Sequence, residues 1–379
     1  MKLNHMNILK RAWRIVWSYR VLWAFGIILA LTTGGGGSSG SNGAGYSGRG
    51  GSDFRFESPA GIQRQLGEMG ESLGEFFEQT FSEGIVPAGI IAGVIALGVG
   101  LACLTLLLIV ASTIARYVAE NALIKLVDDY EETGERRSVK AGFRMGWSRA
   151  AFRQWLINLV ITVPIVVVVI LAIALSLAPL LAWTMKNTIV GIFGTVAAIG
   201  LFFLVILATI VISAIAGLVK KLAFRATSME KLGVFAGIGR GLQLLRENLK
   251  DVGLMWLIMF GIGLAFTVLM IPVVLLTLII AGVACGLLFL GAGGVAGLFF
   301  SGIAHWIIGS IIGLSVFVLL VIIPLTFIGG LYEVYKSSVW TLSYRELAAL
   351  ASLADEDEPE ARTEAADTEE GTNDSDTTE

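Results

Sequence analysis

Four long stretches of this chain contain no Asp, Glu, Lys or Arg at all: Val86–Ile114, Gln154–Met185, Asn187–Val219 and Val252–Tyr332. Each stretch is rich in Leu, Ile, Val, Ala, Gly and Phe. A helix needs about 20 apolar residues to cross the hydrocarbon core of a bilayer, and every stretch exceeds that length. The pattern therefore predicts an all-α protein, a polytopic transmembrane helix bundle.

The apolar runs predict about six spans. A shorter run at 21–33 follows a basic N-terminal segment and predicts a first span that stays attached as an anchor, with a cleaved secretory signal as the alternative. Only Met185-Lys186-Asn187 separates the third span from the fourth, which predicts a tight hairpin. The last run is long enough for two or three crossings. Two crossings, at 252–281 and 305–330, with the glycine-rich stretch 291–297 as a loop or re-entrant segment, keep both termini on one side.

The distribution of charge predicts the orientation. Bases outnumber acids in residues 1–20, 116–153 and 220–250, whereas the segment 34–84 holds three bases and seven acids. Cytoplasmic loops of membrane proteins carry an excess of Lys and Arg. We therefore predict a multi-pass protein of the cell membrane with cytoplasmic N- and C-termini.

These patterns divide the chain into four parts. Residues 1–33 form a basic interfacial helix and the first span, and residues 34–85 form an extracytoplasmic Gly/Ser loop with an amphipathic helix. Residues 86–350 form the membrane domain with its two basic cytoplasmic loops. Residues 351–379 hold 12 acids and one base, so we predict a disordered acidic tail. Removing the tail from the chain's 30 acids and 27 bases leaves 18 acids and 26 bases, which makes the body basic.

Short amphipathic helices are predicted before the first, third and fifth spans, as a weak internal repeat. In each, apolar residues recur at spacings of three and four, and bases occupy the other faces. The predicted apolar faces are Ile8, Ala12, Ile15, Val16 and Tyr19; Phe143, Trp147, Ala150, Ala151 and Trp155; and Phe235, Ile238, Leu242, Leu245 and Leu249. The bases predicted to contact lipid headgroups are Arg144, Arg149, Arg153, Arg240, Arg246 and Lys250. The alternative is that these bases act only as topology signals.

The chain offers little material for catalysis. His5 and His305 have no metal-ligand partner at helical spacing, and Cys103 and Cys285 lie inside apolar runs, where cysteine usually packs as a small apolar residue. Paired carboxylates within 128–132 are ligands that suit Mg²⁺, but neighbouring arginines favour a solvated helix end of mixed charge. We therefore expect no catalytic residue, no metal and no cofactor, and a protein that is not an enzyme.

The segment before the fifth span resembles a known group of proteins. It contains Phe224-Arg225-Ala226, then Met229–Val234 (MEKLGV), then Gly239–Leu249 (GRGLQLLRENL). This pattern is similar to bacterial multi-pass membrane proteins, including the membrane domain found beside glycerophosphoryl diester phosphodiesterases. The resemblance implies a helical membrane domain and no phosphodiesterase activity. The catalytic barrel would need about 200 or more residues, and no hydrophilic stretch approaches that length.

Two functions fit these observations. The first is a non-enzymatic protein that organises membrane lipids, or a membrane or cytoplasmic protein partner, through its basic cytoplasmic helices. The alternative is a carrier or channel for a neutral or apolar substrate, because ion-coupled transport usually needs an ionisable residue within the membrane. Nucleic acid is not an expected partner, since the bases lie beside membrane spans.

Overall fold

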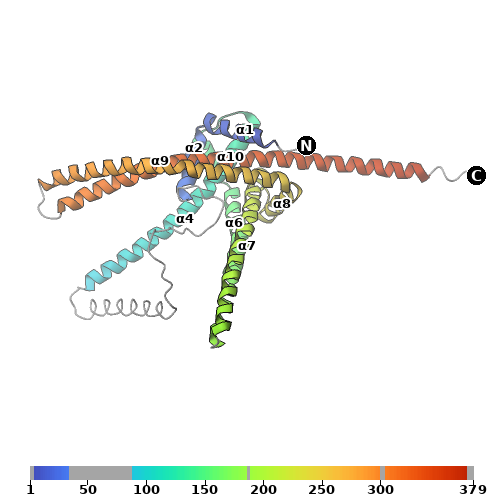
Figure 1. The fold of residues 1–379 in the computed structure, drawn as a ribbon. Coiled ribbons are helices and arrows are strands. Elements are labelled where there is room, and N and C mark those ends of the chain that lie inside the picture. Colours follow the sequence, from blue (N-terminus) through green and yellow to red (C-terminus); the bar gives the residue numbers. More distant parts are fainter. Residues whose placement is uncertain (1–3, 34–87, 186–187, 299–303, 374–379) are drawn as a thin grey trace, which may run out of the picture. The chain divides into compact units, whose positions relative to one another are not determined.

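A computed structural model describes residues 4–33, 88–185, 188–298 and 304–373 (Figure 1). Within these ranges every regular element is a helix and none is a strand, which confirms the all-α prediction. The short elements are α1 (His5–Ser18), α2 (Val21–Thr32), α5 (Val139–Gly146), η1 (Ala178–Met185) and α8 (Val234–Glu247). The long helices are α4 (Ala88–Thr133), α6 (Arg149–Ser176), α7 (Thr188–Met229), α9 (Leu249–Gly297) and α10 (Ala304–Asn373).

The chain divides into two compact units. One comprises Met1–Asn42 and Ile114–Glu379, and the other comprises Gly43–Thr113. In the second unit the described helix is the N-terminal part of α4, where Leu97 and Leu101 expose more than half of their surface. The predicted extracytoplasmic loop 34–85 and its amphipathic helix lie outside the described residues.

Five helices have the length and composition of membrane spans: Ala96–Thr133, Arg149–Ala182, Thr188–Met229, Leu249–Gly297 and His305–Leu353. Their most apolar windows have mean hydropathies of 2.4 to 3.1, and at most 11% of any window is buried. Water would oppose the exposure of so much Leu, Ile and Val surface, whereas lipid accommodates it. The protein is therefore a multi-pass membrane protein.

The predicted first span is shorter than a crossing. α1 and α2 are bent by 100° at a two-residue break, and the count of spans reaches six only if this bent pair is counted as one. α2 has 12 residues and is about 18 Å long, whereas the hydrocarbon core is about 30 Å thick. α1 is an amphipathic helix whose apolar residues Ile8, Ala12, Ile15 and Val16 are all buried within the protein.

The last apolar run forms two span-length helices, as predicted, but the break between them lies later than predicted. α9 runs unbroken through residues 252–281 and on through the glycine-rich stretch 291–297, so that stretch is neither a loop nor a re-entrant segment. α10 lies alongside α9 (Figure 1), and glycines allow the two helices to approach closely. A Cβ on Gly309 of α10 would come within 2.7 Å of the carbonyl oxygen of Phe289 and 3.2 Å of the Gly293 backbone. Close backbone approach therefore explains the glycines better than chain reversal.

The C-terminal segment also differs from the prediction. α10 begins at Ala304 and continues as helix to Asn373. The segment predicted as a disordered tail, 351–379, is thus helical in its backbone as far as Asn373, and residues 374–379 lie outside the described part of the chain.

The main hydrophobic core lies beside the charged segments, at the ends of the apolar runs. Its residues come from 4–33, 114–157, 218–262 and 331–351. We call this core and the helix segments that form it the hub. Its largest fully buried side chains include Trp340, Tyr344, Tyr19 and Phe25. The segments predicted to be basic loops therefore fold into a packed helical assembly.

The three short helices of the predicted internal repeat pack in a similar way. Each short amphipathic helix contacts the hub end of a long helix: α5 packs on α4 and α8 packs on α7. α1 packs on α10, the last helix of the chain. The three short helices thus have equivalent partners, although α1 precedes its own in sequence.

We expect the hub to be cytoplasmic and the segment 34–84 to be outside. In a Cys103→Ala, Cys285→Ala background, an impermeant maleimide added outside intact cells should label Ser47→Cys and spare Arg136→Cys. Arg136 is exposed and is a better probe than Ser138, whose hydroxyl accepts a hydrogen bond from the Ala141 amide at the start of α5. The opposite labelling pattern would invert the topology.

We also expect the acidic tail to be dispensable for folding. Leu350 and Ala351 pack on the hub, so the truncation is placed after Leu353, beyond which the chain has no large apolar side chain. Such a segment has no large apolar side chain to bury, so it adds little to the stability of the hub. The melting temperature of the purified protein should stay within a few degrees of the full chain, with removal of 374–379 alone as the control. A loss of many degrees would instead show a docked tail.

Candidate functional site

Two contacts join the end of α7 to the neighbouring long helices. Ser228 Oγ donates a hydrogen bond to Asn121 Oδ1 of α4 at 2.9 Å. The Arg225 guanidinium donates to the carbonyl oxygen of Ser337 of α10 at 3.3 Å and to that of Lys221 at 2.6 Å. Arg225 is 2% exposed and Asn121 fully buried, and a buried polar group left without a partner costs about 1–3 kcal/mol. These contacts therefore fix α7 between α4 and α10.

An ion pair joins α10 back to α4. Arg345 pairs with Asp128, and its guanidinium also donates to the Asp128 carbonyl oxygen at 3.1 Å. Glu131, on the same end of α4, pairs with Arg11 of α1. The acidic cluster 128–132 is thus used for ion pairs between helices. No group of three or more His, Cys, Asp and Glu in the described part of the chain is placed to hold a metal ion.

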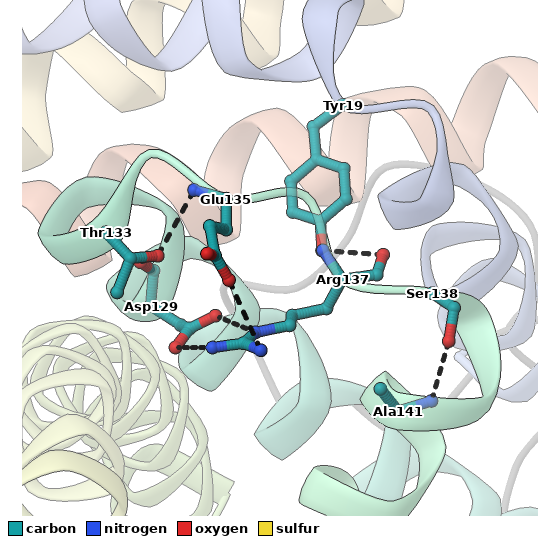
Figure 2. A network of polar contacts seen from close by, with 7 residues as sticks. All are labelled: Tyr19, Asp129, Thr133, Glu135, Arg137, Ser138 and Ala141. Carbon is teal, nitrogen blue, oxygen red and sulfur yellow. Dashed lines mark hydrogen bonds and ion pairs between the residues drawn. The ribbon is translucent and has the colours of Figure 1, made fainter.

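Figure 2 shows how the end of α1 is joined to the segment between α4 and α5. The Tyr19 hydroxyl donates to the carbonyl oxygen of Arg137 at 3.0 Å and accepts from its amide at 2.8 Å. Burial raises the pKa of Tyr19 above its ordinary value, so the hydroxyl keeps its proton at physiological pH. The Arg137 side chain binds Asp129 at 2.8 Å and lies 3.4 Å from Glu135, and the bond to Asp129 raises the pKa of Arg137.

A second network holds the break between α5 and α6. Asn121 Nδ2 donates to the Gly146 carbonyl oxygen at 2.8 Å and to Ser148 Oγ at 2.9 Å. Lys125 Nζ donates to the Met145 carbonyl oxygen at 3.2 Å and to Ser148 Oγ at 2.9 Å. These side chains satisfy carbonyl groups that the end of α5 leaves without a partner within the helix. The chain therefore breaks at residues 147–148, within the segment predicted as one helix.

Glycine forms the side of α5 that packs on the protein. A Cβ on Gly146 would meet the Val118 carbonyl oxygen at 2.5 Å and the Ala122 Cβ at 2.8 Å. Three aromatic residues of the predicted apolar face lie outside this contact. Their exposed fractions are 43% for Phe143, 66% for Trp147 and 37% for Trp155. Ala150 and Ala151 are buried as predicted.

α8 repeats this arrangement on α7. A Cβ on Gly237 would meet Thr227 Oγ1 at 2.6 Å, and one on Gly241 would meet the Ala223 amide nitrogen at 2.9 Å. The buried residues of α8 are Gly237, Gly241, Leu244 and Leu245. Of the predicted face, Leu245 is buried and Ile238 and Leu242 are partly buried, whereas Phe235 is 79% and Leu249 62% exposed.

Two of the six predicted lipid-contacting bases have partners in the protein. Arg153 Nη1 donates to the carbonyl oxygens of Lys231 and Leu232, at 2.8 and 3.1 Å, and so holds the turn between α7 and α8. Arg240 lies 3.8 Å from Glu230, which also binds the Tyr344 hydroxyl. Both bases therefore stabilise the hub, a role that the sequence analysis did not foresee.

The other four bases are exposed and form no ion pair with any described residue: Arg144, Arg149, Arg246 and Lys250. Large apolar side chains lie near them in sequence, with Trp147 and Phe152 near the first pair and Leu249 beside the second. We call these groups the α5–α6 patch (Arg144, Trp147, Arg149 and Phe152) and the α8–α9 patch (Arg246, Leu249 and Lys250). Phe152 is 61% exposed and stacks on Trp155.

The comparisons with known proteins identify a family. A model described as a family of unknown function (DUF7544) matches residues 11–350, most of the chain. The chain belongs to this family. The match takes in all six bases of the predicted site, their patches and almost all of the hub. No curated protein and no solved structure matches the chain.

Sequence reasoning missed the outer face of α1 as a candidate site. Lys10, Trp13, Arg14 and Trp17 line a groove there together with Tyr335 of α10. The available signal was the pairing of Lys10 with Arg14 and of Trp13 with Trp17, each four residues apart and so on one side of a helix. The contact of Trp13 with Tyr335 of α10 is not visible in the sequence.

We expect Gly241→Ala to destabilise the hub and Gly239→Ala to leave it intact. At Gly241 the added methyl meets backbone atoms of α7, and overpacking of this kind costs about 1–3 kcal/mol. At Gly239, on the same helix, nothing lies within 4 Å, and alanine favours helix over glycine by up to about 1 kcal/mol. Thermal melting of the purified protein should show a lower midpoint for Gly241→Ala alone. Equal midpoints would contradict the close packing of α8 on α7.

Proposed function

We propose that this protein is a non-enzymatic membrane protein whose hub lies on the cytoplasmic side and binds anionic lipid headgroups, so that it organises lipid around itself. The observation that carries the proposal is the composition of the two patches. Each combines two exposed bases without an ion-pair partner among the described residues with at least one exposed large apolar side chain.

The position of the patches supports binding to a membrane surface. The α5–α6 patch lies where α6 begins and the α8–α9 patch where α9 begins, and both helices are candidate spans. Aromatic side chains with an adjacent base favour the level of the headgroups, where the ring is partly buried and the charge stays hydrated. Each base near an anionic surface contributes about 1 kcal/mol.

Two of the six predicted bases are left out of the patches because they already bind groups within the protein. Arg153 and Arg240 already have oxygen partners within the protein, so a headgroup would have to compete with them. Arg144, Arg149, Arg246 and Lys250 are available without that competition. The proposal therefore separates four lipid-facing bases from two bases that stabilise the hub.

The full-length protein in nanodiscs provides the test, with energy transfer from tryptophan to dansyl-labelled phosphatidylglycerol or phosphatidylcholine as the readout. The variant Arg144→Gln, Arg149→Gln, Arg246→Gln, Lys250→Gln should reduce the preference for the anionic probe severalfold, as should added salt. A variant that loses two exposed bases elsewhere, Arg136→Gln, Lys231→Gln, is the control and should keep most of the preference.

Equal enrichment of both probes around the unmodified protein would refute lipid recognition and leave the bases as topology signals. A preference that survives in the quadruple variant would place recognition elsewhere on the protein. Melting temperatures of all variants should be compared first, since the proposal concerns exposed side chains whose replacement leaves the hub folded.

A further inference from the structure

The outer face of α1 is built differently from its buried face. Trp13 and Trp17 are 57% and 50% exposed, although the opposite face of the same helix is completely buried. Together with Tyr335 they line a shallow, open groove between α1 and α10. Large aromatic surface is thus presented along the line where the two helices meet.

The aromatic side chains continue beyond the groove as a row. Trp13 contacts Tyr335 with ring centroids 6.0 Å apart, and Trp17 lies between Trp13 at 5.8 Å and Trp23 at 5.9 Å. Trp23 in turn contacts Phe327 of α10 at 5.7 Å. The row therefore follows α10 from Tyr335 to Phe327.

This row crosses the boundary of the apolar run. Phe327 lies inside the charge-free stretch that ends at Tyr332, and Tyr335 lies beyond it. Eight helical residues separate Phe327 from Tyr335, which corresponds to about 12 Å along α10. One end of the row is therefore at acyl-chain depth and the other at headgroup depth, the arrangement that tryptophan and tyrosine favour at a membrane interface.

The charge of the groove is positive. Lys10 and Arg14 line it, and none of its lining residues in the described structure is acidic. Arg20 adds a further cation over the Trp23 ring, at 5.9 Å from its centroid. Arg11, on another side of α1, shows the contrast, because it is paired with Glu131 and lies 3.6 Å from Glu346.

We propose that this groove is a binding site for a single anionic phospholipid, with the headgroup phosphate between Lys10 and Arg14 and an acyl chain along the row from Trp13 to Phe327. Ammonium and guanidinium groups bind phosphate oxygens through charge-assisted hydrogen bonds, while the aromatic rings cover the first part of the chain. The site rests on the membrane location of the protein and is separate from the α5–α6 and α8–α9 patches.

Native mass spectrometry of the full-length protein, titrated with phosphatidylglycerol or phosphatidylcholine, provides the test. The first phosphatidylglycerol should bind more tightly than phosphatidylcholine. Each base near an anionic surface contributes about fivefold to the affinity. The double variant Lys10→Gln, Arg14→Gln should therefore weaken this first binding about 25-fold. Lys10→Arg with Arg14→Lys should restore it, and the control Arg136→Gln with Lys231→Gln should leave it unchanged.

The quadruple variant of the two patches distinguishes this site from the proposed function, because it should lose general anionic enrichment and keep the first bound lipid. If phosphatidylcholine binds as tightly as phosphatidylglycerol, or if Lys10→Gln with Arg14→Gln leaves the first binding unchanged, the groove is only an aromatic anchor and the inference fails. Loss of the first lipid in the quadruple variant alone would likewise overturn it, while supporting the patches as the lipid-binding surface.

Discussion

Everything in the hub depends on three long helices, α4, α7 and α10, holding one another beyond the ends of their apolar runs. The contacts are polar and each joins a different pair: Asn121 with Ser228, Arg225 with Ser337, and Arg345 with Asp128. Within lipid, apolar side chains offer little preference for protein over acyl chains, so packing and hydrogen bonds must supply the specificity. Placing the contacts beside the membrane lets charged side chains take part.

The charges of the hub divide into two kinds. Several on the inner sides of the helices have partners from distant parts of the chain, as Glu131 has Arg11. Those on the outer sides, such as Arg144 and Lys250, have no ion-pair partner among the described residues. A single composition, basic with interspersed acids, therefore supports cohesion of the protein and, in the proposed function, attraction to a lipid surface, and only the fold separates the two roles.

The sequence predicted what depends on long uniform patterns. Charge-free runs gave all five span-length helices, the last run supplying two of them, and the period of apolar residues gave the buried face of α1. That period does not locate the sides of α5 and α8 that pack on α4 and α7, because glycine carries no apolar signal and yet Gly146 and Gly241 make the closest contacts. The hydrogen bond between Asn121 and Ser228 joins residues 107 apart in the chain, and no local sequence pattern encodes such a contact. The clustered glycines at 291–297 were expected to end a helix, but α9 continues through them.

The packing of α1 on α10 has a consequence for the order of events during synthesis. Trp13 and Tyr335 are 322 residues apart in the chain, and a ribosome adds roughly 5–20 residues per second. The first amphipathic helix therefore waits on the order of 15 to 65 s before its partner emerges. During that interval a bilayer surface is the natural place for its apolar face, so the lipid interface would act as a temporary substitute for α10 and be displaced when α10 is in place.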